Sequence, residues 1–198
     1  VYEMISNGDT DGVFQVESSG MRQYLRMLRP TCFEDVIAML ALYRPGPLGS
    51  GMVDEFIKRK HGQVPVVYPH DSLTECLRDT YGVIVYQEQV MQIFRELAGF
   101  SFGQADNVRR AMSKKKHAVM EAEREHFVHG CTEPGHECPG CVANGISEKV
   151  ANEIYDEMSS FASYAFNKSH AACYAYVAFQ TAYLKCHYLS LIHISEPT

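Results

Sequence analysis

The chain has 198 residues, of which 46% are hydrophobic and 21% are charged, a composition typical of a globular protein and not of a disordered one. No apolar run approaches the ~18–20 residues that a membrane-spanning helix needs, so no membrane span is expected. The seven cysteines, an odd number without secretory features, favour a reduced cytoplasmic setting. The start Val1-Tyr2-Glu3 resembles neither a signal peptide nor a natural start, and we expect a piece of a longer protein.

The N-terminal part of the chain predicts a turn followed by helices. Gly8–Gly12 has the composition of a turn, although its D-x-D spacing would also suit a divalent-cation site for phosphoryl transfer. Val13–Val16 predicts a short extended segment. Apolar residues at helical spacing then predict amphipathic helices from Ser18 or Ser19 to Leu28 and from Phe33 to Leu42.

A proline- and glycine-rich segment, Tyr43–Gly51, predicts a shaped loop that carries Arg44. That arginine could contact a phosphate or a carboxylate ligand, or pair with a nearby acidic residue. A helix is expected from Met52 to Lys60, and it ends in the cations Lys58, Arg59 and Lys60. These residues are candidates for DNA binding, but cations also stabilise a helix C-terminus.

The middle of the chain predicts extended segments and then a strong helix. Val64–Tyr68 is expected to be extended, and Tyr81–Tyr86 has the character of a turn and a buried strand. Gln87–Ala98 predicts a helix with one apolar face. Ser101 is suited to cap the next helix.

That next helix carries the most basic stretch of the chain, in which five of the eight residues from 109 to 116 are lysine or arginine. Such a concentration in a chain of net charge −6 repels itself unless an anion lies opposite. The guanidinium groups of Arg109 and Arg110 suit phosphate, and so do the mobile ammonium groups of Lys114, Lys115 and Lys116. The alternative is a solvated helix end.

Residues 129–145 form a loop rich in cysteine, proline and glycine. Cys138 and Cys141 have the C-x-x-C spacing that can supply two zinc ligands. Cys131 is the expected third ligand and His136 the preferred fourth, with His129 as the alternative. Free thiols and a redox pair are the alternatives.

Asn167, Lys168, Ser169 and His170 place four hydrogen-bonding side chains together between aromatic stretches. They can hold a phosphate and border a sugar at a helix start, or simply cap the helix. The helix that follows, Ala171–Tyr188, is expected to be buried on much of its circumference.

Five motifs in this order resemble the C family of bacterial replicative DNA polymerases, typified by the polymerase III alpha subunit. The motifs are Gly12–Gln15 with Glu17-Ser18, Tyr43–Pro47, Tyr86–Met91, Arg109–Met112 with Lys114–Lys116, and Phe166–His170.

The resemblance implies a mainly α fold over residues 1–188, a helical fingers region with a few short strands and the Cys-rich loop. It implies that Arg109, Arg110 and Lys168 bind the phosphates of an incoming dNTP, with Arg44 as a weaker candidate. His170 would lie near the sugar, beside Asn167 and Ser169. Lys114, Lys115 and Lys116 would contact the DNA backbone or the outer charge of the triphosphate.

The implied reaction is template-directed nucleotidyl transfer. Its Mg²⁺ ions would be held by palm aspartates outside this chain, so the chain alone is expected to be inactive and the D-x-D spacing is not a metal site. The implied partners are template–primer DNA, dNTPs and, through other parts of the polymerase, the sliding clamp and clamp loader.

Three features depart from the family pattern. Ala165 stands where the family often has glycine, which is a mild change. The Cys-rich loop is longer than in common members, so the zinc prediction is independent of the resemblance. Residues 189–198 follow no family pattern, and we expect that tail to be an artefact of sequencing. The alternative function is a non-catalytic, zinc-bearing nucleic-acid-binding module.

Overall fold

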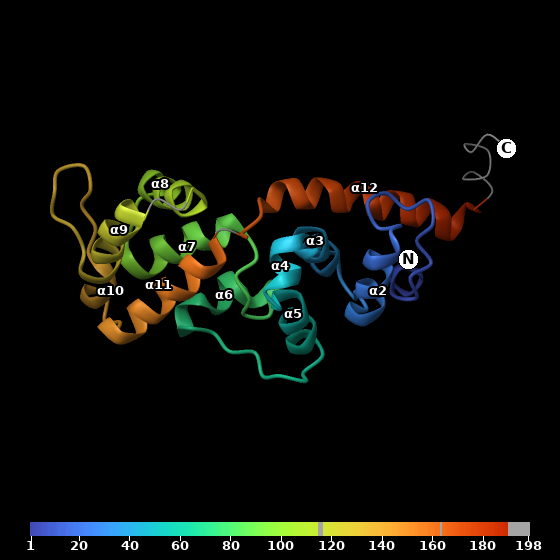
Figure 1. Ribbon diagram of the computed structural model, residues 1–198, viewed down its shortest axis with the longest axis horizontal. Coiled ribbons are helices and arrows are strands. Elements are labelled where there is room, and N and C mark those ends of the chain that lie inside the picture. Colours follow the sequence, from blue (N-terminus) through green and yellow to red (C-terminus); the bar gives the residue numbers. More distant parts are fainter. Residues whose placement is uncertain (115–116, 163, 190–198) are drawn as a thin grey trace. The chain divides into compact units, whose positions relative to one another are not determined.

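The computed structural model describes residues 1–114, 117–162 and 164–189. Nearly all regular structure in that part of the chain is helical, which confirms the mainly α class (Figure 1). The chain divides into two compact units. One unit consists of Val1–Pro65 together with the chain from Asn167 onward, and the other is Val66–Phe166.

The first unit contains α1 (Tyr2–Ser6), α2 (Ser19–Leu28), α3 (Phe33–Leu42), α4 (Pro45–Gly49), α5 (Met52–Lys60) and α12 (Lys168–His187). Figure 1 shows α12 lying along α3. Four alanines form the buried ridge of α12, and they allow close approach because a methyl group is small: Ala171, Ala175, Ala178 and Ala182.

Most of the circumference of α12 is nevertheless exposed. Tyr176 is 61% exposed and Tyr183 is 46% exposed, so the expectation of burial around the helix is wrong. The ring of Phe179 instead provides the larger apolar contacts, with ring centroids 5.3 Å from Tyr2 and 5.9 Å from Phe33.

The start of α2 follows a local sequence rule, whereas α4 was not expected. The Ser18 hydroxyl accepts a hydrogen bond from the amide of Met21 at 3.3 Å, as its capping position predicts. The expected loop at Tyr43–Gly51 contains the single-turn helix α4. Proline is compatible with a first helical turn, because the N–H that it lacks has no intrahelical partner there.

The second unit contains two 3₁₀ turns, η1 (Asp71–Leu73) and η2 (Arg78–Thr80), and the helices α6 (Thr74–Leu77), α7 (Gln87–Ala98), α8 (Phe102–Ser113), α9 (His117–His129), α10 (Gly140–Ala143) and α11 (Glu148–Ala162). Phe94 of α7 is fully buried at the centre of its core. Its ring centroid lies 5.2 Å from that of Phe100, 4.9 Å from that of Phe127 and 6.0 Å from that of Tyr155.

Within the described residues, the buried strand expected at Tyr81–Tyr86 is not formed. The segment Val13–Val16, expected to be extended, forms turns instead, and Val64–Tyr68 is neither helix nor strand. Tyr81–Tyr86 is mostly buried, but it is limited to one parallel bridge, between Tyr86 and Phe166. A second isolated bridge joins Cys131 and Cys138. Burial, rather than sheet pairing, explains the apolar character of these runs.

No helix among the described residues combines the length and the apolar character needed to cross a bilayer.

Candidate functional site

The basic stretch begins on α8, where two arginines share one carboxylate. Asp106 Oδ1 accepts hydrogen bonds from Arg109 Nε at 2.9 Å and from Arg109 Nη2 at 2.7 Å. Arg110 Nε lies 2.8 Å from Asp106 Oδ2. Two guanidinium groups and one carboxylate leave a local formal charge of +1, which favours an additional anion nearby.

Arg109 is also tied to residues far from it in the sequence. Its Nη1 donates to Gln87 Oε1 at 2.8 Å. Gln87, the first residue of α7, donates its backbone N–H to Phe166 O at 2.9 Å and its side-chain amide to Ala165 O at 3.3 Å. The guanidinium is thus fixed by two helices, and 22% of the side chain remains exposed. Preorganisation of this kind lowers the cost of binding an anion.

The contacts with the two arginines also hold Asp106 in its ionised form. The hydrogen bond from Arg109 lowers the pKa of the Asp106 carboxyl, and the charges of Arg109 and Arg110 act in the same direction. Arg110 is the more accessible partner, with 64% of its side chain exposed. The cluster therefore keeps its charges at neutral pH.

Of the three lysines that follow, the structure describes only Lys114. It is exposed and caps the C-terminus of α8, where its backbone N–H donates to Arg110 O. Lys115 and Lys116 lie outside the described residues. The prediction that these lysines contact DNA stays a prediction.

The polar segment Asn167–His170 forms the start of α12. Asn167 is the N-cap, and its side-chain oxygen accepts the amide N–H of His170 at 2.8 Å, so the helix-capping interpretation is correct for this residue. Lys168 is half-buried, whereas Ser169 and His170 are exposed. A helix N-terminus favours negative charge, and Lys168 adds to that preference.

His170 lies beside an aromatic surface. The centroid of its ring lies 4.3 Å from that of Tyr174, which lies 5.5 Å from that of Phe14. Phe14 comes from the first resemblance motif, and its amide donates to Thr181 Oγ1 of α12 at 3.1 Å. Phe14 of the first motif therefore contacts α12, the helix whose start carries the last motif.

Arg44 precedes α4 and is half-buried. Its Nε donates to Ala41 O at 2.7 Å. Burial lowers the pKa of the guanidinium, although arginine remains protonated at neutral pH. The bond to a backbone carbonyl fixes the direction of the side chain, which agrees with its place as a weaker phosphate candidate.

The three cations at the end of α5 differ from one another. Lys58 is exposed. Arg59 pairs with Glu55 within the helix, at 2.6 Å between Nη2 and Oε1. Lys60 is only 7% exposed and lies 2.8 Å from the fully buried carboxylate of Asp35. The ammonium of Lys60 neutralises an internal charge, which disfavours a contact with DNA, and the DNA-binding role of Lys60 stays a prediction.

Asp9 and Asp11 of the N-terminal turn are also ion-paired. Lys185 Nζ lies 2.7 Å from Asp9 Oδ1, and Arg22 pairs with Asp11. These contacts agree with the interpretation of the D-x-D spacing as a turn and not a metal site.

The Cys-rich loop is closed at its base by backbone contacts. Cys131 and Cys138 exchange two N–H···O bonds of 2.9 Å. Gly130 and Gly140, both at positive φ, approach so closely that a β-carbon on Gly140 would lie 2.3 Å from the nitrogen of Gly130. Only glycine fits at these two positions.

The four proposed zinc ligands are not gathered in this structure. Cys141 is fully buried in the apolar core, whereas His136 is exposed on the loop. Within the described residues, no group of three or more His, Cys, Asp or Glu side chains is arranged to hold a metal ion. Burial, and then the neighbouring Cys138, raises the pKa of Cys141 to about 12, which keeps the thiol protonated. Zinc binding stays a prediction.

Two polar residues that the sequence did not assign to a role hold this region together. Gln87 orients Arg109. Gln89 is buried and accepts the amides of Val85 and Tyr86, each at 2.9 Å, while its amide donates to Thr80 Oγ1 at 2.8 Å. The available signal was a pair of glutamines directly after an apolar run, where polar side chains are unusual unless they are satisfied.

The predicted phosphate-binding residues belong to both units. Arg109 and Arg110 lie in the unit of residues 66–166, whereas Arg44 and Asn167–His170 lie in the other. That both groups act on one ligand stays a prediction.

Comparisons with known proteins agree with the resemblance seen in the sequence. Residues 1–135 match the family described as the bacterial DNA polymerase III alpha subunit finger domain. DNA polymerase III subunit alpha of Bacillus subtilis is 50% identical over 187 residues, which is 94% of this chain and 16% of that protein. The subunits of Escherichia coli and Aquifex aeolicus are 48% and 47% identical and are matched over 16% and 15% of their lengths. The chain thus spans about one sixth of these relatives.

Proposed function

Because this chain belongs to the finger-domain family of the bacterial DNA polymerase III alpha subunit, we propose that it forms the fingers region of a replicative DNA polymerase. In this role it binds the incoming dNTP and the template–primer DNA during template-directed synthesis in the cytoplasm. The sliding clamp and the clamp loader would contact other parts of the polymerase.

The geometry of Arg109 is the observation that carries the proposal. A guanidinium held by Gln87 and Asp106 is oriented before any ligand arrives. Its cluster has one more positive than negative charge, so a triphosphate would add favourably. Arg110 extends the same cluster toward solvent.

The start of α12 supplies a second set of residues for this function. Lys168 and the helix N-terminus favour a phosphate group. Ser169 and Asn167 add polar groups, and His170 with its neighbour Tyr174 offers a surface of the size of a sugar or base. Arg44 is the weaker phosphate candidate, because its Nε already donates to Ala41 O.

We expect Mg²⁺ to be held by residues elsewhere in the polymerase. The resemblance to C-family polymerases places the carboxylates that hold these ions in the palm, outside this chain. The isolated chain should therefore not extend a primer. A structural zinc in the Cys-rich loop is a separate proposal, which stoichiometric zinc in chain purified without chelator would support and its absence would refute.

The proposal is tested by single-nucleotide incorporation in the full-length polymerase that carries this segment. Arg109→Ala or Lys168→Ala should lower incorporation of all four dNTPs alike, because phosphates carry no base identity. Loss of one charge-assisted hydrogen bond in a partly desolvated site reduces the rate by roughly ten- to a hundredfold.

Lys149→Ala serves as the matched control, since 84% of that lysine side chain is exposed and its carboxylate partner lies 3.8 Å away. Rates unchanged in Arg109→Ala, or changed for only one base, would contradict the proposal.

His170→Ala should behave differently in the same assay. If the imidazole excludes the 2′-hydroxyl by bulk, ribonucleotide incorporation rises while deoxynucleotide incorporation changes little. An equal decrease for both substrates would mean that His170 has a structural role beside Tyr174.

A further inference from the structure

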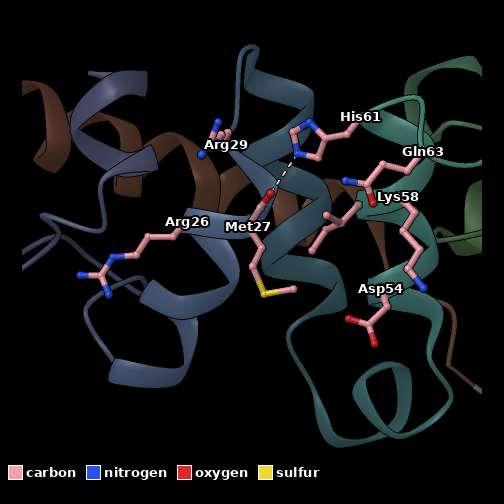
Figure 2. A pocket seen from close by; sticks show the side chains of 8 residues that line it. Arg26, Met27, Arg29, Asp54, Lys58, His61 and Gln63 are labelled. Atoms are coloured by element: carbon pink, nitrogen blue, oxygen red, sulfur yellow. Dashed lines mark hydrogen bonds between the residues drawn. The ribbon is translucent and has the colours of Figure 1, made fainter.

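A groove in the first unit, separate from the start of α12 and from Arg44, is lined by cations. It lies between the C-terminal half of α2 and α5 and has a volume of about 760 Å³ (Figure 2). Its lining residues are Arg26, Met27, Arg29, Asp54, Ile57, Lys58, His61 and Gln63.

The cations that line this groove are accessible to a ligand. Within the described residues, Arg26, Arg29 and Lys58 form no ion pair with a carboxylate, and all three are exposed. Arg26 Nε donates instead to the backbone oxygen of Asn7 at 3.0 Å. Asp54 is the one carboxylate among the lining residues named above. Together with the three cations it gives the groove a formal charge of +2, in a chain whose net charge is −6.

Contacts between α2 and the end of α5 fix the shape of this groove. His61 Nε2 lies 2.9 Å from Met27 O, and it is the donor because a carbonyl oxygen can only accept. This bond joins the residue after α5 to α2. Arg29 adopts φ 48° directly after α2, an uncommon backbone conformation for arginine.

The directions of the cations select the shape of the ligand. In Figure 2, Arg26 and Lys58 lie on opposite sides of Met27, and their charged ends point apart. A compact anion could not contact both of them. An extended polyanion with repeated phosphates could contact one cation after the other, with the half-exposed Met27 between them.

We infer that this groove binds the phosphodiester backbone of a nucleic-acid strand. The inference rests on the proposed function, and it adds Arg26, Arg29 and His61 to Lys58 as a DNA contact surface. Arg59 and Lys60 are excluded from this surface, because each is paired with a carboxylate inside the unit.

The test measures binding of the 198-residue chain to fluorescein-labelled oligo(dT) by fluorescence anisotropy at several salt concentrations. The double variant Arg29→Gln/Lys58→Gln should bind roughly two- to thirtyfold more weakly, the range for two exposed ion pairs. The slope of log K against log salt should fall by about 0.7 for each phosphate that the variant no longer neutralises.

The matched control is Arg78→Gln/Lys149→Gln, which removes the same charge from the other unit at positions that are 62% and 84% exposed. If both double variants bound DNA equally weakly, the loss of net charge alone would explain the effect, and the inference would be overturned. Unchanged binding in the groove variant would overturn it as well. Cations that serve only the helix C-termini would lower thermal stability without changing the salt slope, and that result also overturns it.

A competition experiment distinguishes binding of a nucleic-acid backbone from binding of a free phosphate anion. Unlabelled oligo(dT) should displace the probe at lower phosphate concentration than inorganic tripolyphosphate does. Equal competition would assign the groove to a free anion and overturn the nucleic-acid assignment. Because the readout is DNA affinity and not nucleotide incorporation, failure here is distinguishable from failure of the proposed function.

Discussion

The C-terminal ends of α5 and α8 carry similar runs of cations, but the fold uses them differently. Lys60 of α5 is 7% exposed and faces a carboxylate with no exposure at all. Arg109 and Arg110 of α8 share one partly exposed carboxylate, and 64% of the Arg110 side chain remains exposed. The cations of such a run are therefore accessible to a ligand only where buried acidic groups do not pair with them.

Among the variants at the ends of α5 and α8, the largest effect is expected on the free energy of unfolding, from the ion pair of Lys60. Lys60→Met leaves Asp35 buried without its cation and should lower the free energy of unfolding by about 3–5 kcal/mol. Asp35 keeps bonds from the amides of Thr31 at 2.8 Å and Cys32 at 3.3 Å, which favours the lower end of that range. Urea unfolding of the chain measures the change.

Lys58→Met is the matched control for that experiment, because it removes the same charge from an exposed position of the same helix. It should change stability by less than about 0.5 kcal/mol. If the two variants were equally stable, the ion pair between Lys60 and Asp35 would not be a stabilising element.

A smaller effect is expected from the cluster on α8. Arg109→Ala removes the contacts with Asp106 and Gln87 and should lower the free energy of unfolding by about 1 kcal/mol, the usual net value of such hydrogen bonds. Arg110→Ala should cost less than about 0.5 kcal/mol, since exposed ion pairs contribute little. Thermal unfolding of both variants checks the order, and a larger loss for Arg110→Ala would contradict the geometry.

The smallest effect is a dependence of stability on acid pH. The pKa of Asp106 is lower in the folded chain than in the unfolded chain, mainly because of the bond from Arg109. Its contribution is therefore present above the unfolded pKa of about 3.9 and is lost as the pH falls through the folded value. Asp106→Asn should flatten the decline of stability below about pH 4. An unchanged slope would mean that this carboxylate is not coupled to folding.

The sequence by itself determined most of the local structure. The apolar spacing on α7 predicted the buried face formed by Val90, Ile93, Phe94 and Leu97. Ser18 and Asn167 occupy the capping positions that their side chains favour. Such features depend on residues three or four positions apart, which the helical repeat brings together without help from the rest of the chain. The five motifs were equally readable, and the family match over residues 1–135 and the similarity to DNA polymerase III alpha subunits agree with the resemblance that the motifs carry.

Which polar side chains pair with one another inside the protein could be seen only in the folded chain. Lys60 meets Asp35 from 25 positions away, and Arg109 meets Gln87 from 22 positions away. Local periodicity carries no information about such pairs. For the same reason the apolar run at Tyr81–Tyr86 resembled a strand, although it is buried beneath helices with a single bridge to Phe166. An apolar run in the sequence indicates that a segment is buried away from water. Which residues it packs against depends on the packing of the whole unit.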